Sequence, residues 1–245
     1  MSVRLTLKDM ATAFGGFPEA GYEFLRELKE NNRREWFQPR KEMYEATVKA
    51  PLGELVEALN AEFARFAPEY ITEPKRAIYR IYRDVRFSKE KHPYKTNAAA
   101  GFHASAVEKE SLAGYYVSVS PFEIEIAGGI YMPRPEQMLA IRNRIAEGWE
   151  EWAALVGDKR RQRVAGEVKG EALTRTPKGF AKDHPAEFWL RKKQWLYWDT
   201  GLDPALALRP GFVKEMARRF EAMYPVILFL NGALGGRKAI RSEYF

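Results

Sequence analysis

The spacing of apolar residues changes twice along the chain, and this pattern limits the possible folds more than any other feature of the sequence. Between residues 17 and 67 apolar side chains recur at helical intervals. From residue 77 to residue 131, short runs alternate apolar and polar positions and are rich in β-branched and aromatic residues, as strands are. Helical spacing then returns. Helices, an antiparallel sheet and further helices predict one α+β domain spanning residues 1–245, with a central, mainly antiparallel sheet flanked by helices.

The first 67 residues are expected to form a layer of three helices, each opened by a proline. The first follows Pro18 and ends at residues 31–32, the second runs from Pro39 to about residue 50, and the third begins at Pro51. The side chains expected to face the core in the second and third helices are Met43, Tyr44, Val48, Leu52, Leu55, Val56, Leu59 and Phe63.

The rest of the chain is expected to supply the sheet and the remaining helices. The predicted strands span residues 77–87, 114–120, 123–131 and 194–198. One helix is expected after Pro135, a second starts near residues 183–187 with Asp183 or His184 as its cap, and a third covers about 210–231. The third is expected to turn inward Val213, Met216, Phe220 and Met223, with a kink at Pro225.

Two stretches fit this scheme less well than the others. Residues 157–182 are basic, polar and weakly periodic, and are the best candidate for a mobile or inserted segment. Residues 1–16 are a candidate for a loose end. Neither stretch resembles a linker that would divide the chain, and no internal repeat is present, so the expectation of one domain stands.

The residue types present exclude several kinds of chemistry. The chain has no cysteine, which excludes disulfides, thiolate metal sites and cysteine nucleophiles and suits a reducing cytoplasm. Its histidines, His92, His103 and His184, lie far apart without a helical partner for zinc, so neither a metal site nor a cofactor is expected, although oxygen-ligated magnesium stays open. We see no signal peptide and no run near the ~18 apolar residues of a membrane helix. A cytoplasmic protein without membrane contact is therefore expected.

The net charge of +7 is concentrated in two segments of the chain. Residues 75–95 carry eight Lys and Arg against two Asp and Glu, and residues 157–182 carry eight against three. A local excess of positive charge attracts phosphates, carboxylates or nucleic acid backbones. The alternative is a solvated basic face with no ligand.

The side chains of the predicted strand 77–87 divide into two faces. The odd-numbered face is apolar except for Arg83, and is expected to face the core. A buried guanidinium without a partner is strongly destabilising. Arg83 is therefore expected either to pair with a buried carboxylate or to point into a pocket that receives an anion. On the even-numbered face Asp84 stands between Arg80 and Arg86, at a spacing that lets it orient both.

The strand leads into a loop, residues 88–97, that offers three lysines, three hydroxyl groups and a histidine. Guanidinium, ammonium and hydroxyl groups are the donors that phosphate and carboxylate pockets use. The strand and loop at 80–96 therefore predict a site for a small anionic ligand, and for an enzyme Asp84 and His92 would be the nearby acid–base groups. The alternative is a structural lattice of salt bridges. The predicted ligand-binding residues are Arg80, Arg83, Asp84, Arg86, Ser88, Lys89, Tyr94 and Lys95.

The run YRDVRFSKEKHPYKTN at 82–97 resembles the signature of a bacterial and fungal family known as domain of unknown function 2461. NNRREWF at 31–37, GYYVSVSP at 114–121, AGGIY at 127–131 and PKGFAKDHP at 177–185 follow the order of that family, so the resemblance covers about residues 17–230. It implies a bacterial-type intracellular protein of one domain, and it carries over no catalytic role. Glu90 stands where the family more often has aspartate. The positions that match its central motif are Arg83, Asp84, Arg86, Ser88, Lys89, Tyr94 and Lys95.

Two further functions remain open from the sequence. Segments 75–95 and 157–182 could act as two basic stripes of a nucleic-acid-binding module, with Tyr79, Tyr82 and Tyr94 between them. No RNA- or DNA-binding motif is complete, so this hypothesis ranks second. A scaffold for another protein is the third, and exposure of Trp149, Trp152 or Trp195 would favour it. The sequence leaves the oligomeric state open.

Overall fold

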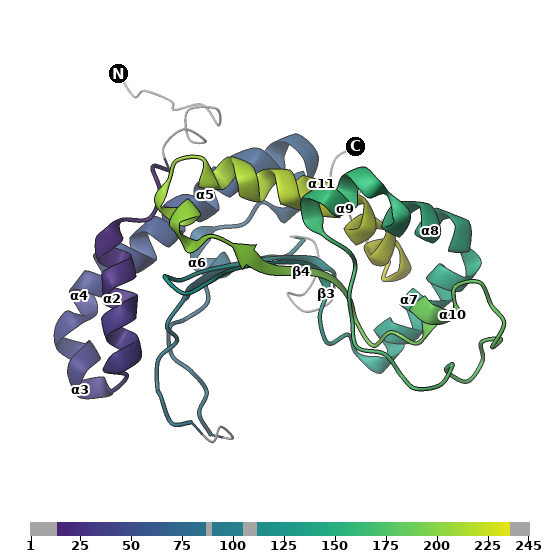
Figure 1. Cartoon of the computed structure of the whole chain (residues 1–245), viewed down its shortest axis with the longest axis horizontal. Helices are drawn as coiled ribbons and strands as arrows, with labels where there is room; N and C mark the ends of the chain where they lie inside the picture. The colour runs from purple at the N-terminus through teal and green to yellow at the C-terminus, as the bar shows by residue number, and fades with distance from the viewer. Residues whose placement is uncertain (1–13, 87–89, 105–111, 236–245) are drawn as a thin grey trace. The chain divides into compact units, whose positions relative to one another are not determined.

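The computed structural model describes residues 14–86, 90–104 and 112–235. These residues form an α+β fold around a four-stranded antiparallel sheet with the order β1-β2-β3-β4 (Figure 1). The strands are β1 (Ala98–Phe102), β2 (Gly114–Val119), β3 (Ile124–Ile130) and β4 (Trp195–Leu202). The α-helices are α2 (Glu19–Glu30), α3 (Arg34–Phe37), α4 (Lys41–Tyr44), α5 (Ala50–Phe66), α6 (Pro74–Ala77), α7 (Pro135–Glu147), α8 (Trp149–Gly157), α9 (Lys159–Ala165), α10 (Glu187–Leu190) and α11 (Phe212–Ala233).

The chain is divided into two compact units, each built from three separate segments. Unit 1 comprises Met1–Phe102, Tyr116–Ile126 and Thr200–Ala217, and unit 2 comprises His103–Tyr115, Ala127–Asp199 and Arg218–Phe245. The unit boundaries fall inside β2, β3, β4 and α11, so each of these elements contributes residues to both units.

The helices of unit 1 follow the predicted spacing, except where the second and third were expected to be separate. α2 begins after Pro18 and ends at its C-cap Asn31, as predicted. The 3-10 turn η1 (Gln38–Arg40), α4, the π-helical turn η2 (Glu45–Lys49) and α5 follow one another without a gap. Pro51 therefore lies in the first turn of α5 but does not follow a loop, because the π-turn accommodates its missing N–H.

The burial of side chains in these helices also confirms most of the prediction. Tyr44, Val48 and the five predicted positions of α5 are buried. Met43 was expected to be buried and is instead 51% exposed. Tyr44 and Val48, four residues apart, lie on the buried face of this helical stretch, and Met43 lies next to that face on the solvent side.

The predicted strand 77–87 is wrong as a regular strand. Residues 78–86 and 90–97 form instead an irregular antiparallel arm, which Figure 1 shows leaving the sheet. Its limbs are joined by the isolated bridge Tyr82↔Tyr94 and by backbone hydrogen bonds from Arg83 N–H to the Pro93 carbonyl (2.8 Å) and from Lys95 N–H to the Ile81 carbonyl (2.8 Å). Pro93 has no N–H to donate, so a continuous ladder cannot form beside it.

The alternation predicted for this segment nevertheless appears in its burial. Ala77 and Ile81 are buried, while Arg80, Tyr82 and Asp84 are exposed. Ile78 bridges to Ala100 of β1, a strand that the sequence analysis missed. β1 packs against α5, where the rings of Phe63 and Phe102 lie 5.0 Å apart.

Unit 2 contains a core of its own, built around tryptophan. Trp152 of α8 is fully buried, and its ring centroid lies 5.4 Å from that of Trp189 and 5.1 Å from that of Phe229. The buried Asn231 of α11 accepts a hydrogen bond from Ala113 N–H (2.8 Å) and donates one to the Ala113 carbonyl (3.3 Å). Each polar atom of the Asn231 amide thus has a partner, as burial requires.

The strands predicted at 123–131 and 194–198 and the helix predicted at about 210–231 are confirmed as β3, β4 and α11. The chain approaches β4 closely at Gly129, which has φ of 134° and where a Cβ would lie 2.7 Å from the Leu196 Cα. α11 covers the expected helix, and the four side chains predicted to turn inward, Val213, Met216, Phe220 and Met223, are buried.

The segment 157–182 is more regular than its weak periodicity suggested. Asp158 caps α9 by accepting hydrogen bonds from the N–H groups of Arg160 and Arg161. Lys169 and Leu196 of β4 exchange two backbone hydrogen bonds, of 2.7 and 3.1 Å. The expectation of Asp183 or His184 as the helix cap is wrong, because α10 begins later and has Ala186 as its N-cap. His184 instead accepts a hydrogen bond at Nδ1 from Ala186 N–H (3.0 Å) just before α10.

Candidate functional site

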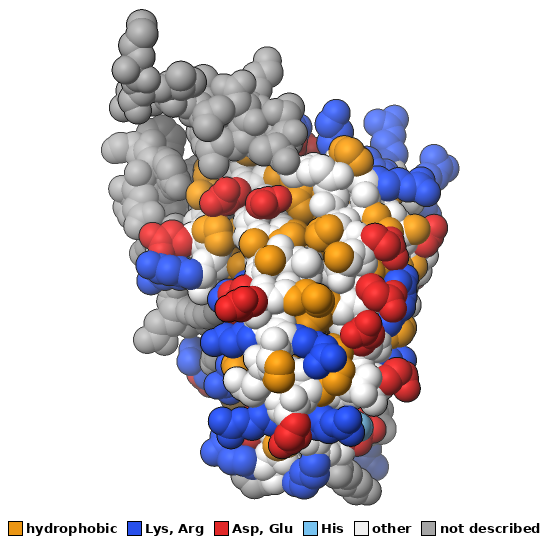
Figure 2. Space-filling view, turned by 90° about the vertical axis from the view of Figure 1, so that its left-hand side faces the viewer, with side chains coloured by type: hydrophobic (Ala, Val, Ile, Leu, Met, Phe, Trp, Pro, Cys, Tyr) orange, Lys and Arg blue, Asp and Glu red, His pale blue; other side chains and the backbone are white. Residues whose placement is uncertain are grey.

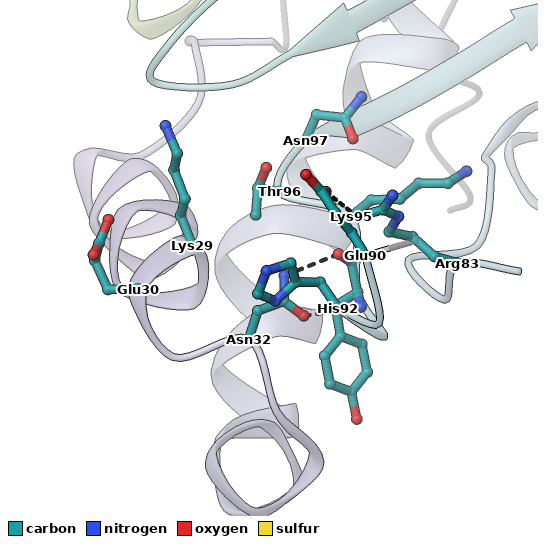
Figure 3. A pocket seen from close by; sticks show the side chains of 10 residues that line it. Lys29, Glu30, Asn32, Arg83, Glu90, His92, Lys95, Thr96 and Asn97 are labelled. Carbon is teal, nitrogen blue, oxygen red and sulfur yellow. Dashed lines mark hydrogen bonds and ion pairs between the residues drawn. The ribbon is translucent and has the colours of Figure 1, made fainter. Parts of the chain in front are cut away.

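A concave site lies within unit 1, between the end of α2 and the arm. It has a volume of about 500 Å³. Figure 3 shows its lining side chains, which come from the C-terminal end of α2 and from both limbs of the arm. The lining residues are Lys29, Glu30, Asn32, Arg83, Glu90, His92, Tyr94, Lys95, Thr96 and Asn97.

Asn32 holds the two walls of this site together. Its side chain donates a hydrogen bond from Nδ2 to the Tyr94 carbonyl and accepts one at Oδ1 from Tyr94 N–H, both at 3.0 Å. The ring of Tyr94 is 2% exposed and stacks on Phe37, with centroids 4.2 Å apart. Tyr94 therefore fixes the arm on the helical layer through its ring, while its backbone contributes to the wall of the site.

Arg83 reaches the site from the first limb of the arm. Its side chain is 34% exposed, and its Nη1 lies 3.8 Å from Oε2 of Glu90, whose side chain is 72% exposed. Figure 3 shows this ion pair on the arm side of the site. Among the described residues Glu90 is the one carboxylate within ion-pair distance of Arg83. A long contact to an exposed partner is worth little, so most of the hydrogen-bonding capacity of the guanidinium remains available.

Lys95 lines the site from the second limb, and Figure 3 shows its side chain running away from α2, past the guanidinium of Arg83. Its Nζ lies 5.3 Å from the ring centroid of Tyr79. Burial, with a smaller contribution from the charge of Arg80, lowers the pKa of Lys95. In the described part of the chain no carboxylate lies within ion-pair distance of Lys95. The ammonium form is therefore less favoured here than on an open surface.

Polar groups on the sheet side of the arm complete the site. Asn97 Nδ2 donates a hydrogen bond to Ser118 Oγ of β2 (2.5 Å). Burial raises the pKa of the neighbouring Tyr116 hydroxyl. Its hydrogen bonds to Ser118 and Asn97 have the opposite, smaller effect and lower that pKa. Thr96 and His92 add a hydroxyl and an imidazole to the lining. The site thus presents cations and neutral hydrogen-bonding groups, together with the carboxylates of Glu30 and Glu90.

The eight residues predicted for the site divide into three groups in the structure. Arg83, Tyr94 and Lys95 line it. Ser88 and Lys89 lie outside the described residues. Arg80, Asp84 and Arg86 do not line it.

Asp84 was expected to orient both flanking arginines, and it pairs with one of them. Its Oδ2 lies 2.7 Å from Arg86 Nη2, on the exposed side of the arm, and the hydrogen bonds from Arg86 lower the pKa of Asp84. Arg80 acts on Asp84 only through its charge. The salt-bridge lattice that was the alternative therefore exists in part, between Asp84 and Arg86, and Arg83 does not belong to it.

Sequence reasoning missed the part of the site that α2 supplies. Lys29, Glu30 and Asn32 lie some sixty residues before the arm, and no local pattern joins the two segments. Asn32 was interpreted as part of a polar helix end. The unusual pair of asparagines at 31–32, with no glycine or proline to end the helix, was the one available signal that these amides have other partners.

The other two functional hypotheses gain less from the structure. Of the three tyrosines proposed to stack on bases, Tyr94 is buried and Tyr82 is 44% exposed. On the face viewed in Figure 2, basic side chains are interspersed with acidic ones rather than forming a continuous stripe. Trp152 and Trp195 are fully buried, which removes two of the three residues named for a protein-binding patch. The described residues contain no group of three or more His, Cys, Asp or Glu that could hold a metal ion.

The fold and the site define an α+β protein with a polar, mixed-charge concavity beside its sheet. Comparison with known families gives a match, over residues 20–229, to the family described as conserved hypothetical protein, DUF2461. The chain belongs to this family. Searches of curated proteins and of solved structures gave no match. Within the described residues, no helix has the length and apolarity needed to cross a membrane.

Proposed function

We propose that the chain binds a small anionic ligand, bearing a phosphate or carboxylate group, in the concave site between α2 and the arm. The observation that carries this proposal is the position of Arg83, whose guanidinium faces the site with only the long contact to Glu90. A guanidinium offers a planar fork of N–H donors that matches two oxygens of one oxyanion. Lys95, His92, Thr96 and Asn97 supply further donors around the same space.

The carboxylates of the site support a specific version of this proposal. Glu90 lies next to Arg83 and is more exposed than its partner, so it competes with a ligand for the guanidinium. An incoming anion replaces this carboxylate at Arg83, and Glu90 then turns to solvent. Because exposed ion pairs are worth about 1 kcal/mol or less, the competition weakens binding by no more than about fivefold.

The main test measures the thermal stabilisation of the protein by phosphate, nucleotides and dicarboxylates. A ligand at about 100 times its dissociation constant stabilises the folded protein by about 2.7 kcal/mol, which a melting curve resolves. The melting temperature of the wild type should rise with at least one of these anions, and that of Arg83→Ala should not. Arg86→Ala is the matched control, because Arg86 lies on the same arm and pairs with Asp84 outside the site. Equal shifts in wild type and Arg83→Ala would contradict the proposal.

A second variant tests the role of Glu90. Glu90→Gln should bind the same anion up to about fivefold more tightly in a calorimetric titration, and the gain should shrink as salt screens the charges. Glu45→Gln removes one negative charge from an exposed ion pair with Lys49 away from the site and should leave the affinity unchanged. If Glu90→Gln and Glu45→Gln increase the affinity by the same factor, the cause is the change of net charge, and Glu90 does not compete with the ligand for Arg83.

A further inference from the structure

The surface where the arm packs on α3 and α4 carries more positive charge than its carboxylates can neutralise. Residues 31–44 contain four Lys and Arg against two Glu, and residues 78–97 contain six against two Asp and Glu. The two segments meet where Asn32 and Phe37 contact Tyr94 of the arm. Figure 2 views the side on which α2, α3 and α4 lie, and there Lys and Arg side chains outnumber acidic ones toward the lower end. The positive charge of both segments is thus brought to one region of unit 1.

Several cations of this surface lack the ion pairs that other exposed cations of unit 1 make. Arg26 of α2 and Lys49 of η2 each pair with a carboxylate of their own helical stretch, at 3.0 and 2.6 Å. In the described part of the chain, the following exposed side chains of the surface have no carboxylate within ion-pair distance: Arg33, Arg34, Lys41 and Arg80. Exposed charges without a partner attract a polyanion more strongly than charges that are already paired.

The helical spacing places two of these cations beside an exposed aromatic ring of the arm. Arg34 and Lys41 lie three residues before and four residues after Phe37, so they share its face of the helical stretch. The ring of Phe37 lies 6.4 Å from that of Tyr82, which is 44% exposed. Arg80 stands two positions before Tyr82 on the exposed side of the arm. The Tyr82 ring therefore lies between cations of the helices and a cation of the arm.

We propose that this surface binds single-stranded nucleic acid, with phosphates at Arg34, Lys41 and Arg80 and a base stacked on the ring of Tyr82. Proteins that bind single strands combine cations that follow the backbone with aromatic rings on which unpaired bases stack. A duplex keeps its bases paired, and an acidic polypeptide has no base to stack, so the exposed ring favours a single strand over both. Segment 157–182, the second basic segment of the sequence, belongs to unit 2 and takes no part.

The inference is tested by fluorescence anisotropy of the full-length protein with labelled oligothymidylate and oligouridylate of about 12 nucleotides, a usual length for one single-strand site. Three phosphate contacts predict an affinity that falls roughly twentyfold between about 50 and 200 mM salt. The comparison of the two probes distinguishes DNA from RNA as the better ligand. A duplex of the same length and polyglutamate should both compete several-fold less well than the unlabelled single strand. Absence of binding by both probes at about 50 mM salt would overturn the inference.

Four variants test the residues of the surface. Lys41→Ala and Arg80→Ala should each weaken binding and lower the salt slope by about 0.7. Lys49→Ala is the matched control, because it removes the same charge from an ion pair on the same helical stretch, and it should leave the affinity unchanged. Tyr82→Ala should weaken binding by about 5- to 150-fold through loss of stacking. Tyr82→Phe keeps the ring and should bind like the wild type, so it serves as the folded control if Tyr82→Ala is unstable.

Arg83→Ala separates this inference from the proposed function. This variant should lose the stabilisation by small anions and keep most of its affinity for the oligonucleotide, and Lys41→Ala should do the reverse. If Arg83→Ala abolishes oligonucleotide binding while Lys41→Ala retains it, the strand is bound in the concave site and this inference is wrong. If Lys49→Ala weakens binding as much as Lys41→Ala, or the duplex competes better than the single strand, the attraction comes from net charge alone and the inference is also wrong.

Discussion

Asn32 shows how a single side chain can decide the geometry of the site. It is the one side chain of the α2 end that bonds both the N–H and the C=O of Tyr94, at 3.0 Å each. At the bridge between Tyr82 and Tyr94 the hydrogen bonds to the first limb come from Pro93 and Lys95, so the N–H and C=O of Tyr94 itself are not bonded to that limb. Asn32 therefore supplies the two backbone hydrogen bonds of Tyr94 that a neighbouring strand would supply in a sheet.

Replacing Asn32 by alanine should destabilise the protein by about 1–3 kcal/mol, because two polar backbone groups lose their partners in a partly buried place. The measurement is the free energy of unfolding from urea denaturation. Asn31→Ala is the control: the Asn31 side chain bonds only to the Glu27 carbonyl on the exposed end of α2, so its loss should cost about 0.5 kcal/mol or less. Similar losses for the two variants would show that Asn32 is not the link between α2 and the arm.

Glu125 provides a prediction about pH. It lies on β3, where burial and the nearby charge of Glu123 raise its pKa above the ordinary value of 4.5. A carboxyl group with a raised pKa in the folded state destabilises the protein while it is charged, and this effect disappears as pH falls through the raised pKa. Glu125→Gln should therefore have a higher melting temperature than the wild type at pH 7.

The difference between Glu125→Gln and the wild type should become smaller as the pH falls and should vanish below about the ordinary pKa of a glutamate. Melting curves at a series of pH values check this. Glu123→Gln, a change of the more exposed neighbour, should show a weaker dependence on pH. A difference that stays constant from pH 7 to acid would mean that the substitution acts through packing and not through the charge.

At the level of elements, the π-helical turn η2, between α4 and α5, constrains the neighbouring helix α2. Gly21 of α2 lies directly against the Thr47 carbonyl, which belongs to η2. A Cβ at position 21 would clash with this backbone oxygen, which cannot move without disturbing the helix. Glycine is therefore required at position 21 by the close approach of two helices and not by its own dihedral angles.

Gly21→Ala should destabilise the protein by about 1–3 kcal/mol, as overpacking does, although alanine is the better helix former. Gly53→Ala is a matched control in α5, because a Cβ there meets nothing within 4 Å. That change should instead stabilise by about 0.5–1 kcal/mol through helix propensity. The measurement is the free energy of unfolding of both variants from chemical denaturation. A neutral or stabilising Gly21→Ala would show that α2 can shift away from the π-turn.

The elements that the sequence predicted well are those in which burial alone sets the pattern. In α5 the apolar residues recur with a 3.6-residue period, which places them on one face of the helix, and that face is buried. These residues are Leu52, Leu55, Val56, Leu59 and Phe63. β1 was missed because its sequence, AAAGF, has no β-branched residue and carries high helix propensity. Contacts with α5 and β2, which are distant in sequence, decide its conformation.

The candidate site was predictable to the extent that it lies on one continuous segment. The cations of the arm could be read from the sequence, and a position of Arg83 beside a pocket was one of the two alternatives that the alternation of residues 77–87 left open. Asp84 pairs with Arg86 rather than with Arg80 in a local turn, in which Arg86 N–H also donates to Asp84 Oδ1 (3.2 Å), and a pattern of alternation contains no such information. The part of the site that α2 supplies is brought to the arm by tertiary packing, which no local sequence pattern shows.

For the whole molecule, the division into two units raises the question of whether they unfold separately. Each unit is assembled from three segments, and β2, β3, β4 and α11 pass from one unit into the other. A strand or helix cannot lose its structure in one unit without losing hydrogen bonds next to the other. We therefore expect a single cooperative transition for the chain, as in a one-domain protein.

The distribution of tryptophan allows this expectation to be tested directly. Trp36 is the one tryptophan of unit 1, and the other five, between residues 149 and 198, belong to unit 2. In Trp36→Phe the tryptophan fluorescence therefore reports on unit 2 alone, while far-ultraviolet circular dichroism reports on the helices of both units. The two signals should have the same urea midpoint and slope, because elements shared by the units couple their unfolding. A fluorescence transition displaced from the circular dichroism transition would mean that each unit is stable without the other, and the chain would then consist of two domains despite the shared strands.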